Sequence, residues 1–410
     1  MLSPYRVLDL TNENGFLCGK ILADLGADVI KVEPPGGDPA RMIGPFCKDI
    51  PDPEGSLFWL AYNTSKRGIT LSLETQDGRE ILKELIRTTD FVIESFPPGY
   101  TDDLGLGYSS LRKINNRLIM TSITSFGQGG PYKDYKSSDL IAMAMGGLMY
   151  SIGDSDRAPL RFSLEQVYPQ AGIQAAMATL IAHNYRRTSG EGQHIDVSIQ
   201  ECVTSMLEHR YHFLEYGEEG SDRRRGQRVM RGGGKTAPLH IWPCRDGYVC
   251  WRVFTAAQGS KTKALVEWME EEGMGKKVNQ VDWAAVDFEK LSQEQLGAWE
   301  KEFGKFFLMH TKTELQREAM KRDIMMFPVN TIEDLLKDEQ LAVRDFWVEV
   351  KHAEISCTLT FPGAPYKLEQ PLWRISQRAP LIGEHNLEIY QGELGFSRGE
   401  LVMLKQAGII

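Results

Sequence analysis

Hydrophobic and polar residues follow two different periods over the first two hundred positions of the chain. Short runs rich in branched residues predict strands at residues 6–10, 28–33, 69–73, 90–94 and 118–123. Apolar residues at helical spacing predict helices between them, at residues 19–25, 76–88 and 108–114. Because strands and helices alternate through short loops, the pattern predicts an α/β fold with a parallel sheet.

The stretch 161–202 predicts one more helix and one more strand. Small and apolar residues recur at helical spacing from Pro169 to Arg187, and the turn Ser189–Gly192 ends that helix. The alternation over 194–198 is typical of a strand. We expect the start of this helix to face the chemistry.

The pattern changes after Cys202, and 410 residues exceed the usual size of a single core. A charged, glycine-rich stretch over 215–231 is followed by a predicted hairpin around Asp246-Gly247 and by amphipathic helix over 263–315. Short strands and loops return from residue 327. We therefore expect a large α/β domain in residues 1–215, a small domain in 216–325 and a C-terminal part in 326–410.

Composition limits the partners. The net charge of −9 argues against nucleic acid as the main partner, and an anionic ligand would need a local basic pocket. No apolar run approaches the ~20 residues of a membrane span. The six cysteines form no CxxC pair and the first residues lack a leader pattern, so we expect reduced, buried thiols, no metal site and a cytoplasmic protein.

The expected sheet also predicts where a ligand lies. In open α/β sheets, ligands gather at the carboxyl ends of the strands. The loops after Glu33, Leu73, Glu94 and Ile123 are therefore the expected pocket. No GxGxxG follows the first strand, so the standard dinucleotide fingerprint is absent.

Short motifs in a fixed order extend over nearly the whole chain. They are Val7–Thr11, Leu22–Glu33, Asn63–Arg67, Pro98-Gly99 with Leu104-Gly105, Ser122–Gly127, Ser189–Gln193 and Ala379–Asn386. This ordered set resembles the class III CoA-transferases, the family of formyl-CoA transferase and carnitine CoA-transferase. Any one motif is weak, and the set as a whole carries the resemblance.

The resemblance implies a large domain built on a parallel sheet and formed from both chain ends, with the small domain inserted between them. It also implies an interlocked dimer, with coenzyme A or acyl-CoA as substrate and no permanently bound cofactor. The CoA contacts carried over by position are Pro34, Leu71, Ser72, Leu73, Ser95, Phe96, Thr124 and Ser125. Similar proteins often place a basic residue at Pro34 and Thr124, so Lys66, Arg67 or Arg41 is expected to supply the charge instead. A solvated turn is the alternative for Lys66 and Arg67.

In the proteins that the chain resembles, an aspartate attacks the acyl-CoA thioester, and a mixed anhydride and an aspartyl-CoA thioester follow. Backbone N–H groups of a glycine loop stabilise the oxyanion. Gly232, Gly233 and Gly234 are similar to that loop. A plain flexible linker is the other interpretation of these three residues.

The position of that aspartate holds a tyrosine here. Counted back from the Ser189-Gly190 turn, the position is Tyr168, and a phenol cannot form the acyl anhydride. Glu165 is the nearest carboxylate and shares a helical face with Tyr168 if the helix has already begun, although a solvated residue before the helix is the simpler interpretation. Glu13, in a short loop, is a second candidate.

The racemases related to this family use a histidine–aspartate pair before the same helix. Here that segment is Ser137-Ser138-Asp139-Leu140, without the histidine. We expect Asp139 to cap a helix over 140–149, and racemisation is disfavoured.

Three functions remain open. The first is a CoA-transferase protomer that works with a homologous partner chain carrying the aspartate, as in two-subunit benzylsuccinate CoA-transferases, within a heterodimer or heterotetramer. The second is a self-sufficient transferase, such as a homodimer, that uses Glu165 or Glu13 to move CoA between a thioester and a carboxylic acid. The third is a CoA-thioester-binding structural subunit without turnover.

Overall fold

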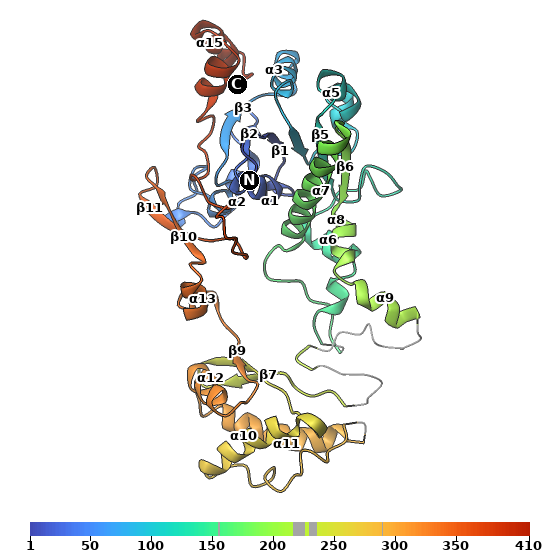
Figure 1. Cartoon of the computed structure of the whole chain (residues 1–410), viewed down its shortest axis with the longest axis vertical. Coiled ribbons are helices and arrows are strands. Elements are labelled where there is room, and N and C mark those ends of the chain that lie inside the picture. The colour runs from blue at the N-terminus through green and yellow to red at the C-terminus, as the bar shows by residue number, and fades with distance from the viewer. Residues whose placement is uncertain (155, 216–225, 229–235, 289) are drawn as a thin grey trace. The chain divides into compact units, whose positions relative to one another are not determined.

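The computed structural model describes residues 1–410 except 155, 216–225, 229–235 and 289 (Figure 1). Contacts divide these residues into two compact units. The first unit comprises Met1–Leu148, Arg161–Glu208 and Glu339–Ile410, and the second comprises Met149–Leu160 and His209–Asp338. The domain boundaries expected at residues 215 and 325 stay predictions, because a division by contacts does not show which parts fold independently.

A six-stranded parallel sheet is the centre of the first unit (Figure 1). Its strands are β1 (Arg6–Leu10), β2 (Asp28–Glu33), β3 (Arg67–Thr70), β4 (Phe91–Glu94), β5 (Ile119–Thr124) and β6 (His194–Ser198). They lie in the order β3-β2-β1-β4-β5-β6. The predicted α/β fold is confirmed. The order reverses between β1 and β4, where such sheets open a crevice at their carboxyl edge.

Helices cover both faces of this sheet. On one face, α3 (Gln76–Ile86) and α5 (Tyr108–Ile114) pack their apolar residues on Leu8, Ile30 and Val92. On the other face, α1 (Phe16–Asp24) packs against α7 (Val167–Ser189). The two helices approach closely because α7 presents small residues, and a Cβ added at Gly172 would lie only 2.9 Å from the Cβ of Leu17. Gly190, with φ of 80°, ends α7 as the sequence predicts.

The remaining elements of the first unit are short. Its helices are α2 (Leu57–Tyr62), α4 (Tyr100–Asp103), α6 (Asp139–Met145), α8 (Ile199–Ser205), α14 (Glu339–Val343) and α15 (Arg398–Gln406). A hairpin of β10 (Trp347–His352) and β11 (Cys357–Pro362) belongs to its C-terminal part. Helix α9 (Glu208–Glu215) begins where the chain passes into the second unit.

The C-terminal residues cover the edge strand β3 and add no strand to the six-stranded sheet. Gly68 N donates to Nδ1 of His385 at 3.1 Å, and Thr70 N donates to Oδ1 of Asn386 at 2.9 Å. The Tyr390 hydroxyl donates to Thr70 O at 2.6 Å. An edge strand leaves such backbone groups unpaired, so these side chains replace the missing neighbour strand.

The second unit combines a small antiparallel sheet with helices. The strands are β7 (Ile241–Cys244), β8 (Gly247–Cys250) and β9 (Phe327–Pro328). The longer helices are α10 (Gly259–Glu271), α11 (Gln293–Phe307) and α12 (Lys312–Lys321), and α13 (Ile332–Leu336) is short. The predicted hairpin at Asp246-Gly247 joins β7 to β8. No described helix in either unit has both the length and the apolar character needed to cross a membrane.

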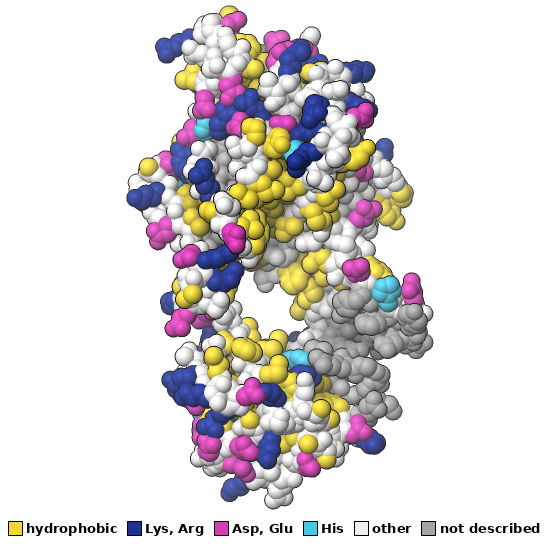
Figure 2. Space-filling view, in the orientation of Figure 1, with side chains coloured by type: hydrophobic (Ala, Val, Ile, Leu, Met, Phe, Trp, Pro, Cys, Tyr) yellow, Lys and Arg dark blue, Asp and Glu magenta, His cyan; other side chains and the backbone are white. Residues whose placement is uncertain are grey.

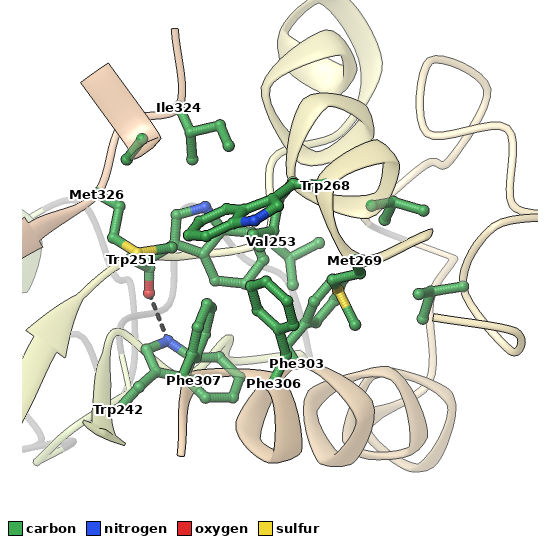
Figure 3. Close-up of a cluster of buried hydrophobic side chains, with 14 of the residues drawn as sticks. Trp242, Trp251, Val253, Trp268, Met269, Phe303, Phe306, Phe307, Ile324 and Met326 are labelled. Carbon is green, nitrogen blue, oxygen red and sulfur yellow. Dashed lines mark hydrogen bonds between the residues drawn. The ribbon is translucent and has the colours of Figure 1, made fainter. Parts of the chain in front are cut away.

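Aromatic side chains fill the core of the second unit (Figure 3). Trp268, Trp283 and Phe303 are buried, and Trp299 packs against this cluster while half-buried. The indole N–H of Trp242 donates to Trp251 O at 2.7 Å, which gives a buried polar group its partner.

A fully buried ion pair joins β1 to the turn before β3. The Nζ atom of Lys66 lies 2.8 Å from Oδ2 of Asp9 and also donates to Phe16 O at 3.0 Å and to Oδ1 of Asn63 at 2.8 Å. The other oxygen of Asp9 accepts from the N–H and hydroxyl of Thr11, at 3.0 and 2.6 Å. All three ammonium donors are used, which is the condition under which a buried ion pair is tolerated.

The charges of this pair depend on each other. Burial would raise the pKa of Asp9, but Lys66 and Lys31 outweigh it and hold that pKa below its usual value. Burial lowers the pKa of Lys66, and Asp9 opposes this shift. Removing either partner therefore leaves the other as an uncompensated buried charge.

We expect Lys66→Met to lower the free energy of unfolding by about 3–5 kcal/mol, because it leaves Asp9 buried without its cation. The matched control is Lys83→Met, since Lys83 of α3 pairs only with the exposed Glu80, and its cost should stay within about 0.5 kcal/mol. Urea denaturation of both variants measures the difference. Equal costs for the two substitutions would contradict the role given to the Lys66–Asp9 pair.

Candidate functional site

A cavity of about 440 Å³ opens at the carboxyl ends of β1, β2, β3 and β4. This is the edge where the strand order reverses. Its wall consists of Leu10, Thr11, Asn12, Glu13, Lys31, Val32, Glu33, Pro34, Asp38, Pro39, Leu71, Ser72, Leu73, Glu74, Ser95, Phe96 and Tyr100. Six of the eight expected CoA contacts therefore meet around one cavity: Pro34, Leu71, Ser72, Leu73, Ser95 and Phe96.

Hydrogen bonds fix the loops of this wall. The hydroxyl of Ser95 accepts from Asn12 N and donates to Oδ1 of Asn12, both at 2.8 Å, so the loops after β1 and β4 hold each other. Ser72 N donates to Ile409 O at 2.7 Å, which ties the loop after β3 to the end of the chain. The aromatic rings of Phe96 and Tyr100 lie 4.8 Å apart at their centroids.

Thr124 and Ser125 lie outside the lining of this cavity. Thr124 ends β5 and is 5% exposed, and within the described residues its hydroxyl oxygen has no hydrogen-bond partner. Ser125 is half-buried, and its carbonyl accepts from Gln200 N at 3.0 Å. The cavity reaches the end of β4 but not that of β5, so six of the predicted CoA contacts line it and the two at the end of β5 do not.

The three basic residues expected to supply charge do not line the cavity either. Arg41 is 1% exposed, lies between Glu33 (2.6 Å) and Glu54 (2.7 Å), and stacks on Trp59. Lys66 is the buried partner of Asp9 described above. Arg67 begins β3, at the amino edge of the sheet, where it pairs with Asp28, Glu388 and Glu393. The expectation is corrected because acidic partners distant in sequence already engage all three cations.

The cavity wall is mainly acidic and neutral. Lys31 is its basic residue, and the Lys31 ammonium donates to Thr11 O and lies 3.5 Å from Oδ2 of Asp38. Glu13, Glu33, Asp38 and Glu74 supply the acidic side chains. This composition suits a neutral, amide-containing chain better than a phosphate.

Arg79 is a residue that sequence reasoning missed. It lies in the first half of α3, where an arginine resembles an ordinary surface cation. Its Nη1 atom donates to the carbonyls of Leu73 and Glu74, both at 3.0 Å, and both residues belong to the cavity wall. Its place six positions after the expected CoA contact Leu73 is the signal that points to it.

The start of α7 gathers three carboxylates around Tyr168. The helix begins at Val167, so Glu165 precedes it, is exposed, and does not share a helical face with Tyr168. Burial raises the pKa of Tyr168, and Glu13, Asp139 and Glu165 raise it further. The phenol therefore stays protonated at neutral pH. Burial likewise raises the pKa of Glu165, with Asp139 and Glu13 adding to the effect.

Glu13 connects the cavity wall with the start of α7. It lines the cavity, and it acts electrostatically on Tyr168 and Glu165. The close packing of α1 on α7 at Gly172 explains this position, because the loop with Glu13 directly precedes α1.

Asp139 has a different role from the one expected. Ser138 is the N-cap of α6 and accepts from Ile141 N at 3.4 Å. The Asp139 carboxylate accepts from Val167 N at 2.9 Å, so it caps the first turn of α7. The expected helix over 140–149 is the shorter α6, which ends at Met145.

Glu94 is a second residue that the sequence did not single out. It ends β4, is 2% exposed, and accepts from Phe96 N at 2.7 Å. Burial raises its pKa to about 7, a shift that Ser122 and the Phe96 N–H oppose and Asp102 and Asp196 increase. Because Phe96 lines the cavity, Glu94 holds part of the cavity wall in place.

Gly232, Gly233 and Gly234, for which the sequence leaves an oxyanion loop and a plain linker open, lie outside the described residues.

A cavity at the switch point of a parallel sheet, built from the loops that carry the sequence motifs, agrees with the match to a family model. Residues 2–386 match the model of CoA-transferase family III. The chain belongs to this family. Members of the family named below are CoA-transferases, so the chain is a member of an enzyme family that transfers CoA.

Two relatives illustrate the range of the family. The chain is 35% identical to the succinyl-CoA:(R)-benzylsuccinate CoA-transferase subunit BbsE of Thauera aromatica, over 100% of this chain and 98% of that protein. It is 32% identical to a formyl-CoA:oxalate CoA-transferase of Streptomyces avermitilis, over 100% of this chain and 99% of that protein.

A solved structure has the same fold. The CAIB/BAIF family protein from Brucella suis superposes with a TM-score of 0.81 at 27% identity, covering 95% of this chain and 98% of that chain. The family match and the structural match therefore each cover most of the chain.

We expect the stability of the protein to fall as the pH rises through 7, because Glu94 must ionise while buried. A glutamate whose pKa rises from 4.5 to about 7 on folding stabilises the native state fully below pH 4.5 and loses that contribution as the pH passes 7, by about 3 kcal/mol. Glu94→Gln imitates the neutral carboxyl and should remove this part of the pH dependence. Urea denaturation from about pH 5 to pH 8 measures it.

The control for this experiment is Glu84→Gln on the exposed side of α3, which should keep the pH dependence of the wild type. An unaltered pH profile in Glu94→Gln would contradict the buried neutral state of Glu94.

Proposed function

We propose that this chain is a CoA-transferase protomer that moves CoA between an acyl-CoA thioester and a carboxylic acid, together with a homologous partner chain that carries the nucleophilic aspartate. One observation carries the proposal. The cavity at the strand ends is lined by six expected CoA contacts, and the nearby helix start presents a protonated tyrosine where the family's aspartate would stand.

The chemistry of the wall supports CoA as the ligand. The pantetheine arm of CoA is neutral and contains two amides, which suits the backbone groups and the acidic side chains described above. Phosphates would lie outside the cavity, near cations such as Arg79. Pro34, Leu71–Leu73, Ser95 and Phe96 are accordingly proposed to contact CoA, whereas Thr124 and Ser125 are proposed only to border the site.

Tyr168 is unsuited to the covalent relay. A phenol with a raised pKa remains a neutral hydrogen-bonding group, and an aryl ester is not the anhydride that the relay needs. In this proposal Tyr168 fills the space of the nucleophile, and the acyl transfer takes place at the partner chain. The name of the Thauera aromatica relative, which is a subunit, supports such an assembly.

An apolar surface on α7 supports a partner of this kind. Ile173, Met177, Ile181 and Tyr185 follow one another at intervals of four residues and are 48 to 63% exposed. Figure 2 shows hydrophobic side chains gathered over the region where Figure 1 draws α1 and α7. Such a stripe on a long helix is typical of an interface. A heteromer is proposed, and an interlocked homodimer is the alternative assembly.

A second candidate function is a transferase that needs no partner nucleophile and uses Glu13. The observation that favours it is the position of Glu13 in the cavity wall, whereas Glu165 is exposed and precedes α7. The Glu13 carboxylate would attack the thioester carbonyl and release CoA as thiolate. The thiolate would attack the glutamyl carbonyl and release the first acid, and the acceptor carboxylate would repeat the exchange in reverse.

We expect Ser95→Arg to lower the affinity for CoA at least a hundredfold, because the long side chain enters the cavity and the bond to Asn12 is lost. Ser109→Arg, the same change on the exposed surface of α5, should leave the affinity unchanged. Isothermal titration with CoA measures both, after circular dichroism has shown that both variants fold. Equal affinities in the two variants would exclude this cavity as the CoA site.

The nucleophile is tested by turnover with a good acyl-CoA donor, for the chain alone and with a homologous partner. We expect negligible turnover by the chain alone. With the partner, we expect turnover, and Tyr168→Phe or Glu165→Gln in this chain should change its rate less than about threefold. If the chain alone shows turnover and Glu13→Gln lowers the rate by about a thousandfold or more, the partner proposal is wrong and Glu13 is the nucleophile. Hydroxylamine trapping and peptide mass spectrometry identify the acylated residue in either case.

A further inference from the structure

Two cysteines that are 310 positions apart in the sequence meet in the first unit. Cys47 begins a short 3-10 helix, Cys47–Asp49, and Cys357 begins β11. Their Sγ atoms lie 3.9 Å apart, and the Cys47 thiol donates to Cys357 Sγ. Both residues are half-buried, so solvent reaches them.

The other four cysteines have different surroundings. Cys18, Cys202 and Cys244 are buried, as the sequence analysis expects, and Cys250 is exposed. Burial raises the pKa of the Cys202 thiol to about 11 and also raises that of Cys18, which keeps both thiols protonated and unreactive. The expectation that all the thiols are buried is therefore wrong for Cys47, Cys250 and Cys357.

Several contacts hold the two thiols next to each other. The ammonium of Lys48 donates to Ile355 O at 3.2 Å, between the turn of the hairpin β10–β11 and the segment with Cys47. Ile355 and Leu359 pack on a buried cluster that includes Phe16 and Trp59. The contact of the thiols is thus part of a docked hairpin.

We propose that Cys47 and Cys357 are the site of a reversible disulfide that ties the hairpin β10–β11 to the loop following β2. A disulfide has an S–S bond of about 2.05 Å, so the sulfurs must approach by roughly 2 Å, which side-chain rotation supplies. A small disulfide such as oxidised glutathione is the oxidant class. No other pair of thiols in the described residues is recorded in such contact.

The reaction is a thiol–disulfide exchange in two steps. One cysteine, as its thiolate, attacks the small disulfide, forms a mixed disulfide and expels one small thiolate. The second cysteine then attacks the protein sulfur of the mixed disulfide and expels the second small thiolate. The two cysteine protons end on the two small thiols, the protein loses two electrons and the oxidant gains them.

The cross-link affects the side of the cavity formed by the loop after β2. That loop contains Pro34, Asp38 and Pro39 of the cavity wall and continues to Cys47. Arg41 anchors the middle of the loop to Glu33 and Glu54. A disulfide at Cys47 fixes its far end to β11, and it closes a very long chain loop, which restricts the unfolded state most strongly.

The test uses the full chain treated with oxidised glutathione, then alkylated and digested without reductant. We expect mass spectrometry to find a peptide that links Cys47 to Cys357 and disappears on reduction. We also expect the oxidised wild type to melt several degrees above the reduced protein. Cys250→Ser should behave as the wild type in both measurements, since Cys250 takes no part.

In Cys47→Ser and in Cys357→Ser, the remaining thiol should gain one glutathione, and the melting temperature should not rise on oxidation. Circular dichroism shows whether each variant folds, and the second variant keeps the test valid if the first does not fold. Full alkylation of Cys47 and Cys357 after oxidation, or one glutathione on each of them without a link, would overturn the proposal. A link without any rise in melting temperature would overturn the tether.

Discussion

The buried contact between Lys66 and Asp9 is the constraint on which the cavity depends. One ammonium group joins the end of β1, the start of α1 at Phe16 and the end of α2 at Asn63. Asp9 in turn binds Thr11, whose carbonyl accepts from Lys31 in β2. The two loops that form much of the cavity wall are thus held by one chain of charged and polar contacts. The sequence connects the motif around Lys66 with ligand binding. In the structure, Lys66 does not line the cavity but stabilises the loops that form its wall.

The wall and the helix start of α7 together define what the site can do. The neutral and acidic wall supports the proposal that the amide-containing arm of a CoA ester binds here, with its phosphates outside the cavity. Glu13 lines this wall and also acts electrostatically on Tyr168, whose phenol is protonated at neutral pH. In the proposed function, this chain binds CoA and a carboxylate of the partner chain carries out the covalent transfer.

The sequence predicts most of the sheet because branched apolar residues mark its strands, although β3 (Arg67–Thr70) begins before the predicted range of 69–73. The strand ends then locate the cavity by topology alone. Local patterns fail where distant charges meet. Arg41, Lys66 and Arg67 resemble free cations in the sequence, yet Glu33, Asp9 and Asp28 neutralise them after folding. Asp139 likewise caps α7 across a long loop instead of its own helix. Periodicity shows which face of an element is buried, but not which charged groups that burial brings together. For this reason the sequence did not reveal that Glu94 is buried.

The side chains that cover the edge of strand β3 come from far along the chain, and this affects the sheet while the protein is being synthesised. The sheet is complete once Ser198 has left the ribosome, but His385, Asn386 and Tyr390, which satisfy its edge, are synthesised later. With roughly two hundred residues between them and synthesis at ~5–20 residues per second, the nascent sheet spends ~10–40 s with an open edge. During that time the unpaired backbone groups of β3 can pair with a neighbouring nascent chain, so faster synthesis after Ser198 shortens the exposure.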